Sequence, residues 1–486
     1  MSNQRSSSLS SSPHSLSAFS NKKTIIVILL LVTAFLYFIA SSFFSREGED
    51  FLTSKHLVSS RVHHNDLQFI ENHDLIRKKW MKSKRLSVVD DWQDDYMLDF
   101  TNAKIYPVTF LDLEPVEENA NIGRMKALCK LYLFSYFTFN TRESSKDDFI
   151  IPTVIGAESD KSETFTPYTH WKKVEKLHEF LNSPESKYIR PHDYIMFSDA
   201  TDVFFVNNIK KSKEIFENYY MKQIAGIDLE NDAEKRWPIV FCAEKNRWPP
   251  DDFMQNMFAK TEKEEQMVSK HYYDRDGYFI HQNCDRSNQR IYLNSGFMMG
   301  RKRDFIEMLH VALTEVTLGE PKVSEQSECK KLYPSQYSFQ HMNVKTTNWL
   351  QKQKPRIEDQ ALYQYMHATQ KYPFLTDCEA KLVYSPFSVC ENVKSDSSSE
   401  WGCSLTDSPH RPFALHSNGG LCPSVCTCLR TIHESRHLKQ NIEKQLTTDF
   451  AIHSYHVGMK TTKRYPLMPV CGKYLDEQYP ASVCNR

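Results

Sequence analysis

Residues 194–205 read YIMFSDATDVFF and place two carboxylates, Asp199 and Asp202, between two apolar runs. Carboxylates cannot lie in an apolar core without a partner for their charge, so this segment cannot be buried throughout. It predicts an apolar strand that ends at the edge of a sheet, where a turn directs both carboxylates at one point. Such hard oxygen ligands suit Mg²⁺ or Mn²⁺. The alternative is a surface turn in which one carboxylate caps a helix.

The rest of the chain alternates between strand-like and helix-like runs. Apolar runs predict strands at residues 103–111, 147–156, 193–205 and 237–244, and apolar residues at helical spacing predict helices at 122–137 and 169–181. This alternation is typical of βαβ units, so we expect an α/β fold with a mostly parallel sheet flanked by helices. Ligands bind such sheets beyond the carboxyl ends of the strands. Residues 317–350 lack periodicity and are expected to form a long loop or insertion.

A membrane anchor is predicted before this domain. Residues 24–44 form a run of 21 residues without a charge, and a helix needs about 20 apolar residues to span a bilayer. Lys22 and Lys23 precede the run, whereas acidic residues outnumber basic ones directly after it. The positive-inside rule then places the N-terminus in the cytoplasm and the remaining chain in the lumen. We therefore expect a single-pass type II membrane protein of the Golgi or endoplasmic reticulum.

Charge and cysteine content narrow the class of partner and the compartment. The chain has 61 basic and 61 acidic residues, so it has no excess positive charge for nucleic acid. All 12 cysteines follow the predicted anchor, and in an oxidising lumen they predict disulfides. Seven of them come after residue 389. The alternative for Cys422, Cys426 and Cys428 is a metal knuckle.

Five short motifs follow one another in a fixed order over roughly residues 103–420. They are Asp199 with Asp202; Ala243-Glu244 with Trp248-Pro249; Tyr292-Leu293-Asn294-Ser295-Gly296; Glu358-Asp359-Gln360; and His416-Ser417-Asn418-Gly419. Five ordered motifs are far more specific than any one of them alone. In this order and content the chain resembles the collagen hydroxylysine glycosyltransferases, including the glycosyltransferase domain of the procollagen lysyl hydroxylases. With 66 residues after Gly420, we expect no lysyl hydroxylase domain to follow.

The resemblance implies a GT-A fold, bound Mn²⁺ (or Mg²⁺) and a UDP-sugar donor, with a hexose transferred to a protein or glycan acceptor. It implies that Asp199, Asp202 and His416 hold the metal. Imidazole is a better ligand for Mn²⁺ than for Mg²⁺, and the alternative for His416 is a plain turn residue. The candidate catalytic residues are Glu244, Glu358 and Asp359, although acidic residues in the first turn of a helix are often only caps.

The candidate donor- and acceptor-binding residues have side chains that suit a sugar or a phosphate. Amide, hydroxyl and glycine positions can bind sugar hydroxyls or let the backbone approach a ligand, and an indole can stack on a sugar ring. An ammonium group on the predicted helix 169–181 could contact a phosphate; the alternative there is an exposed helix lysine. The candidates are Lys173, Thr201, Trp248, Asn294, Ser295, Gly296, Gln360, Asn418 and Gly419.

Two positions depart from the family pattern. The family often has an aromatic residue near the donor base where this chain has Thr201, and a second glycine where this chain has Phe297. These departures affect the expected donor more than the expected reaction.

Two other functions compete with this one. His433-Glu434-Ser435-Arg436-His437 matches the HExxH pattern of zinc peptidases, in which both histidines share one helix face and bind zinc. Basic residues surround this match, and no third ligand is evident. The second alternative is a glycosyltransferase fold that serves as a non-catalytic luminal binding module.

The sequence therefore predicts five regions along the chain. They are a cytoplasmic tail at 1–23, an anchor at 24–44, a stem at 45–100, a glycosyltransferase domain at 101–420 and a disulfide-rich segment at 421–486.

Overall fold

The computed structural model describes the part of the chain that follows the predicted stem, with gaps. The described residues are 102–111, 122–140, 150–157, 171–245, 261–273, 284, 290–316, 359–386, 390–396, 398–399, 401–418, 423–434, 451–456 and 460–474. In these ranges, no helix combines the length and the apolar character that crossing a bilayer requires. The predicted anchor at 24–44 and the predicted loop at 317–350 lie outside them.

One large sheet dominates the described residues. Eleven strands form it there, in the order β13-β12-β2-β1-β3-β6-β5-β8-β11-β4, with β7 also paired to β5. The strands are β1 (Ile105–Phe110), β2 (Thr153–Ala157), β3 (Tyr194–Asp199), β4 (Val203–Phe205), β5 (Ile239–Glu244), β6 (Tyr292–Arg301), β7 (Phe374–Asp377), β8 (Val383–Tyr384), β11 (Ala414–His416), β12 (Ala451–His456) and β13 (Thr461–Pro466). A separate hairpin pairs β9 (Val393–Ser395) with β10 (Cys403–Leu405).

Most neighbouring strands run parallel, as the alternation of strands and helices predicts. Strands β12, β2, β1 and β3 are parallel to one another, and so are β7, β5, β8 and β11. Strand β6 is antiparallel to both β3 and β5, which therefore point in the same direction. The carboxyl ends of β3, β5 and β11 and the beginning of β6 consequently lie at one edge of the sheet.

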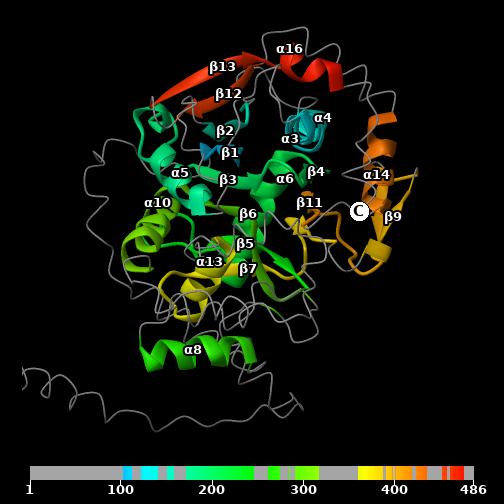
Figure 1. The fold of residues 1–486 in the computed structure, drawn as a ribbon. Coiled ribbons are helices and arrows are strands. Elements are labelled where there is room, and N and C mark those ends of the chain that lie inside the picture. The colour runs from blue at the N-terminus through cyan, green and yellow to red at the C-terminus, as the bar shows by residue number, and fades with distance from the viewer. Residues whose placement is uncertain are drawn as a thin grey trace, which may run out of the picture. The chain divides into compact units, whose positions relative to one another are not determined.

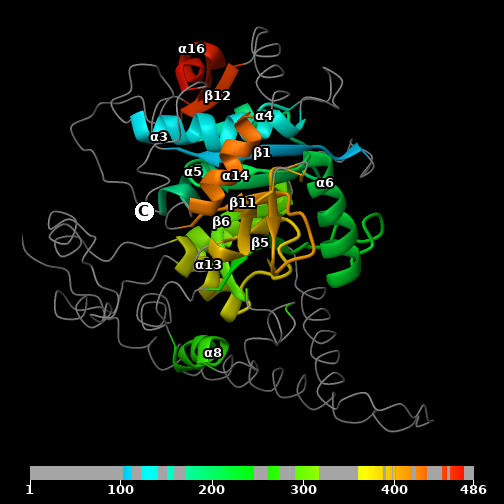
Figure 2. The ribbon, with the colours of Figure 1, turned by 90° about the vertical axis from the view of Figure 1, so that its right-hand side faces the viewer.

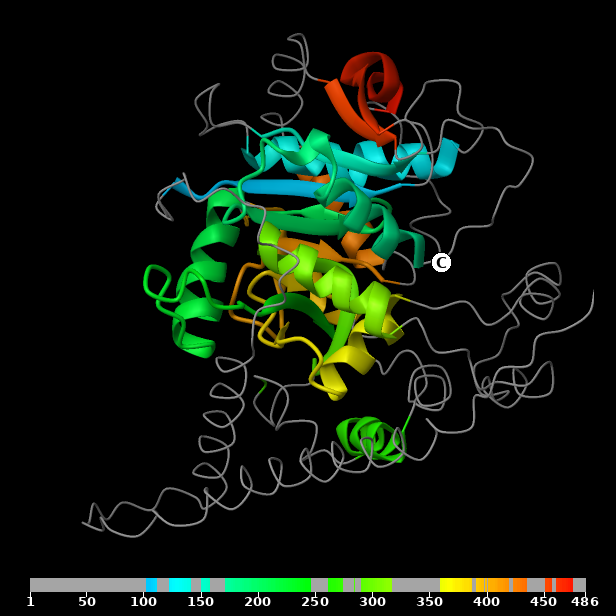
Figure 3. The ribbon, with the colours of Figure 1, turned by 90° about the vertical axis from the view of Figure 1, so that its left-hand side faces the viewer.

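Helices cover both faces of the sheet (Figure 1). One face packs against α5 (Trp171–Leu181), α10 (Lys302–Val311) and α13 (Asp359–Ala368), and Figure 3 views this side. The other face packs against α3 (Ile122–Ala127), the π-helical segment η3 (Leu128–Phe134), α4 (Ser135–Asn140) and α14 (Pro423–Glu434), which lie toward the viewer in Figure 2. This mixed α/β arrangement is compatible with the GT-A fold that the resemblance implies.

The sheet curls back on itself beside the carboxylate pair. Strands β3 and β4 are separated in the sheet by four other strands, which would put them roughly 24 Å apart in a flat sheet. The chain from Asp199 to Val203 can span at most about 14 Å. The strands β11 and β4 must therefore fold over β6, and Phe413 beside β11 indeed contacts Phe297 of β6, with their ring centroids 6.4 Å apart.

The residues after 420 contribute to the same sheet. Strand β12 pairs in parallel with β2, and β13 forms the edge. Cys471 at the end of α16 (Leu467–Cys471) is bonded to Cys129 of η3, so the C-terminal strands are also covalently attached to the domain.

Disulfides form among the described cysteines, as the sequence predicts. Besides the bond to Cys129, Cys284 is bonded to Cys378 and Cys403 to Cys428. Cys426 is disulfide-bonded as well. The alternative metal knuckle is therefore wrong, because Cys426 and Cys428 are engaged in disulfides. Among the described cysteines, Cys242 is free and buried in β5.

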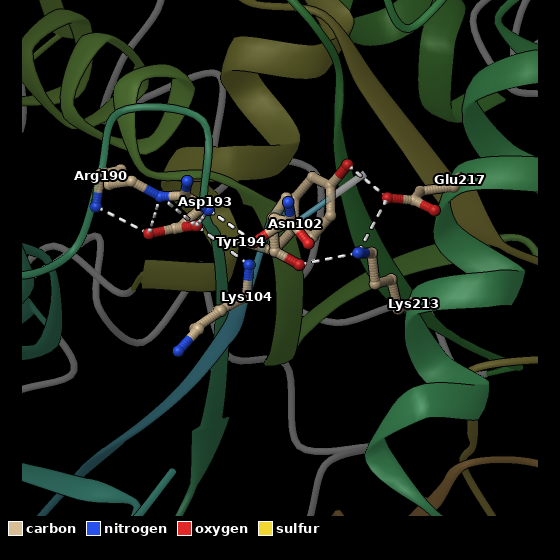
Figure 4. A network of polar contacts seen from close by, with 8 residues as sticks. Asn102, Lys104, Arg190, Asp193, Tyr194, Lys213 and Glu217 are labelled. Atoms are coloured by element: carbon tan, nitrogen blue, oxygen red, sulfur yellow. Dashed lines mark hydrogen bonds and ion pairs between the residues drawn. The ribbon is translucent and has the colours of Figure 1, made fainter. Parts of the chain in front are cut away.

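Polar contacts hold the amino-terminal ends of β1 and β3 together (Figure 4). The Asp193 carboxylate accepts a hydrogen bond from the Lys104 backbone N–H at 2.9 Å and forms an ion pair with Arg190 at 2.8 Å. The Tyr194 hydroxyl donates to Glu217 at 2.8 Å. These contacts connect the strands to the preceding loop and to the π-helical segment η5 (Ile215–Ile224). The opposite edge of the sheet carries the candidate site.

Two predicted elements differ from the observed ones. The predicted strand at 193–205 is two strands, because the residues after Asp199 turn and Val203–Phe205 pairs with β11 instead of extending β3. The predicted helix at 122–137 extends to Asn140 and contains the π-helical segment η3.

Candidate metal and sugar-nucleotide site

The three predicted metal ligands lie together at the carboxyl edge of the sheet. Asp199 ends β3, Asp202 lies in the turn before β4, and His416 ends β11. One ligand atom from each lies within 4.8 Å of the others. The Ser417 backbone N–H donates to the Asp202 carbonyl at 2.8 Å and fixes the turn against β11. The curl of the sheet thus assembles residues that are more than 200 positions apart.

The side chains of this group fit a divalent cation. The His416 Nε2 atom lies 3.6 Å from Asp202 Oδ2, and the His416 side chain is almost fully buried. Neither ring nitrogen of His416 nor Asp202 Oδ1 has a hydrogen-bond partner among the described residues. Buried polar atoms of this kind normally have partners. One imidazole and two carboxylates form a donor set that suits Mn²⁺.

The electrostatics of the group are also those of a cation site. Burial raises the pKa of Asp199, which the Lys173 ammonium opposes and Asp202 reinforces. Burial alone would lower the pKa of His416, but the charges of Asp202, Asp199 and Glu244 raise it above its ordinary value. The carboxylates around His416 thus favour a positive charge at this point.

Lys173 lies inside the site, so the alternative of an exposed helix lysine is wrong. Its Nζ atom is 2.6 Å from Asp199 Oδ1 and 3.7 Å from Asp359 Oδ2, and the side chain is 6% exposed. Lys173 lies on the face of α5 that also buries Leu177 and Phe180. The spacing i, i+4, i+7 of these residues is a sequence signal that indicates the inner face for Lys173.

Glu244, at the end of β5, is 1% exposed and bound by carboxamides. Its Oε1 atom accepts from Gln360 Nε2 at 2.7 Å, and its Oε2 atom accepts from Asn418 Nδ2 at 2.9 Å. Burial raises the pKa of Glu244, whereas hydrogen bonds from Gln360, Asn418 and Asn294 lower it. The motifs that contain these four residues therefore meet at one carboxylate.

Asn294 and Gly296 lie in the first half of β6, and Gly296 lies next to His416. The Gly296 backbone N–H donates to Asn294 Oδ1 at 2.8 Å. A Cβ atom added to Gly296 would lie within 2.8 Å of three atoms of the His416 ring. The glycine of this motif is thus required for the histidine to enter the site. Phe297, where the family has a second glycine, is a buried core residue.

The remaining candidates are divided between the site and the undescribed residues. Thr201 is half-buried in the turn between Asp199 and Asp202, and Ser295 is buried in β6. Asp359 begins α13 and is buried beside Lys173. Trp248, Glu358 and Gly419 lie outside the described residues.

The HExxH pattern does not form a described metal cluster. His433 and Glu434 end α14, and His437 lies outside the described residues. In the described part of the chain, the one cluster of three potential ligands is Asp199, Asp202 and His416. Because His437 lies outside the described residues, the zinc-peptidase alternative stays untested.

Comparison with known proteins gives little beyond this geometry. No protein-family model and no curated protein matches the chain. Among solved structures, mouse xyloside xylosyltransferase 1 in its apo form matches with a TM-score of 0.31 and 12% identity, over 65% of this chain and 98% of that chain. A likeness at that level carries no argument, so the function must be inferred from the site itself.

Proposed function

We propose that this chain is a metal-dependent glycosyltransferase that uses a nucleotide-sugar donor. The observation that carries the proposal is the convergence of Asp199, Asp202 and His416 on one point at the carboxyl edge of an α/β sheet. A donor diphosphate carries negative charge that must be compensated as the bond to the sugar breaks. A cation held by two carboxylates and one imidazole compensates it, and when bound it acts as a Lewis acid on the diphosphate.

The reaction replaces one bond at the sugar C1 atom by another. The acceptor hydroxyl oxygen bonds to C1, the bond from C1 to the diphosphate oxygen breaks, and its electron pair leaves with the nucleoside diphosphate. The hydroxyl proton passes to a base or to the departing phosphate. Lys173 supplies a second positive charge next to Asp199, and in this proposal it turns toward the donor phosphate.

The donor in this proposal is a UDP-hexose, and Mn²⁺ is the preferred metal. The imidazole of His416 supports Mn²⁺ over Mg²⁺, because nitrogen is a poor ligand for Mg²⁺. The acceptor is a protein or a glycan. Asn294, Ser295 and Gln360 supply amide and hydroxyl groups at the edge of the site, and such groups bind sugar hydroxyls.

We further propose that the protein is a type II membrane protein of the Golgi or endoplasmic reticulum. The uncharged run at 24–44 and the lysines before it support the topology. The disulfides of the described domain are consistent with an oxidising lumen. Protease protection of intact microsomes tests this part: a C-terminal tag that is digested without detergent would overturn the topology.

The decisive experiment for the activity is a screen of UDP-sugar hydrolysis by the full-length chain, with and without Mn²⁺. We expect turnover with at least one UDP-sugar, and we expect EDTA to abolish it. The substitution His433→Ala separates the two activities. A zinc peptidase would lose its peptidase activity in this variant, whereas the UDP-sugar turnover of the proposed glycosyltransferase should stay unchanged. A non-catalytic binding module would show no turnover with any donor, and that result would overturn the proposal.

A further inference from the structure

The buried carboxylate of Glu244 is shared by three segments that are far apart in the sequence. It accepts hydrogen bonds from Gln360 on α13 and from Asn418 after β11. Asn294 at the beginning of β6 is a third hydrogen-bonding neighbour. A carboxylate accepts with both oxygens and donates with neither, so it can hold several carboxamide N–H groups at once.

Each of these carboxamides stands next to a group of the metal site. Asn418 follows His416 by two residues, on the same short segment. Asn294 also holds the Gly296 backbone N–H at 2.8 Å, and Gly296 provides the space for the His416 ring. Glu244 therefore reaches His416 from two directions.

The third carboxamide leads to the other side of the site. Gln360 is the neighbour of Asp359, whose carboxylate lies 3.7 Å from Lys173 Nζ. Lys173 in turn lies 2.6 Å from Asp199. A single carboxylate thus connects to both ends of the metal site, although it contributes no ligand atom to the Asp199, Asp202 and His416 cluster.

We propose that Glu244 is a positioning residue, which sets the geometry of the metal site by holding Asn294, Gln360 and Asn418, and is not the group that reacts with the sugar. The inference rests on the proposed function, because it assumes that Asp199, Asp202 and His416 bind a metal. Both oxygens of Glu244 accept from protein amide groups, and the residue is 1% exposed, so Glu244 is held among protein groups. Groups that orient metal ligands typically change metal affinity by about 10- to 100-fold when they are altered.

The substitution Glu244→Gln tests the inference, with Mn²⁺ affinity of the full-length chain measured by electron paramagnetic resonance of free Mn²⁺. Glutamine replaces one acceptor oxygen by an NH₂ group that faces an amide donor. We expect Mn²⁺ to bind about 10- to 100-fold more weakly. UDP-sugar turnover at subsaturating Mn²⁺ should fall in parallel and recover in part at high Mn²⁺.

Glu307→Gln is the matched control. Glu307 is also a buried glutamate, on α10, and it pairs with Arg236. Its substitution should lower the melting temperature while Mn²⁺ affinity stays at the wild-type value. An equal loss of Mn²⁺ affinity in both variants would mean that Glu244 acts only through stability, and it would overturn the inference.

A double-mutant cycle separates positioning from other roles. Asn418→Ala should weaken Mn²⁺ binding by itself, and the two losses together should be less than additive, because either change removes the hydrogen bond between Asn418 and Glu244. Fully additive losses would contradict the inference. Wild-type Mn²⁺ affinity in Glu244→Gln, with turnover reduced to background at every Mn²⁺ concentration, would make Glu244 the reacting group instead. A wild-type chain without Mn²⁺ binding would refute the proposed function and this inference with it.

Discussion

The His416 imidazole occupies the space into which any side chain at position 296 would project. A Cβ atom at Gly296 would lie 2.8 Å from His416 Nδ1 and closer still to two other ring atoms. The contact joins β6 to β11 across the curl of the sheet. It also links two motifs that are 120 residues apart, so the position of a candidate metal ligand depends on a glycine that binds no metal.

The substitution Gly296→Ala should therefore displace His416 without removing it. We expect Mn²⁺ affinity to fall by at least about tenfold, because the added methyl group would push a candidate ligand out of its position. Gly123→Ala is the control, since a Cβ atom there meets nothing within 4 Å. Because position 123 is in a helix, this substitution should leave the free energy of unfolding unchanged or raise it by up to about 1 kcal/mol. Unchanged Mn²⁺ binding in Gly296→Ala would contradict a role for His416 as a ligand.

Asp202→Asn tests the carboxylate pair. The variant keeps the shape of the side chain but loses a negative ligand, so Mn²⁺ binding and UDP-sugar hydrolysis should both fall to background. Without metal, the repulsion by Asp202 that raises the pKa of Asp199 disappears, and the attraction to His416 is lost as well. These effects oppose each other, so the melting temperature without Mn²⁺ should change little.

The matched control for Asp202→Asn is Asp228→Asn, in a solvent-exposed turn where the carboxylate accepts hydrogen bonds from Glu230 and Asn231. It should keep full turnover. Full turnover in Asp202→Asn itself would remove the metal site from the proposed function. Collapse of the fold in that variant would make Asp202 structural.

Much of this architecture follows from local patterns. Apolar runs predict β1, β3 and β5, and the polar residues that end them predict which edge carries the site. The reversal of β6 cannot be read from its residues, because a buried strand is apolar in either direction. The fold of β11 over β6 depends on the pairing of β4 with β11, which is a tertiary contact between residues some 200 positions apart.

The site residues, too, could be predicted from the sequence only where a local pattern marks them. Asp199 and Asp202 stand out because their charges interrupt an apolar segment. Lys173 appears as one of many helix lysines until its spacing from Leu177 and Phe180 is considered. The links from Glu244 to Gln360 and Asn418 join separate motifs, and no local pattern encodes such long-range hydrogen bonds.

Asp377→Asn should be among the more destabilising single changes. The buried Asp377 carboxylate ends β7 and accepts from the Tyr220 hydroxyl and from the backbone N–H groups of Lys381, Leu382 and Val383. An asparagine amide would turn an NH₂ group toward at least one of these donors. We expect a loss of about 3 kcal/mol in the free energy of unfolding.

Urea unfolding of the wild type and of Asp377→Asn measures this loss. The control is Asp396→Asn, which changes a carboxylate in a surface turn. The control should stay within about 0.5 kcal/mol of the wild type. A wild-type urea midpoint for Asp377→Asn would show that these hydrogen bonds do not stabilise the connection from β7 to β8.

Lys302 should make the stability of the domain depend on alkaline pH. Burial lowers the pKa of Lys302 from 10.5 to about 8, with Asp193 opposing this shift. Between these values the unfolded chain holds a proton that the native chain has released, so the free energy of unfolding rises with pH. Between pH 8 and 9.5 this difference raises the free energy of unfolding by about 2 kcal/mol.

The variant Lys302→Met lacks the titrating group, so the free energy of unfolding of the wild type should rise by this amount relative to that of the variant. Urea unfolding at pH 7.5 and 9.5 measures the difference, and Lys210→Met, at an exposed helix lysine, should show no such change. A difference between wild type and Lys302→Met that is constant with pH would show that Lys302 titrates at its ordinary pKa.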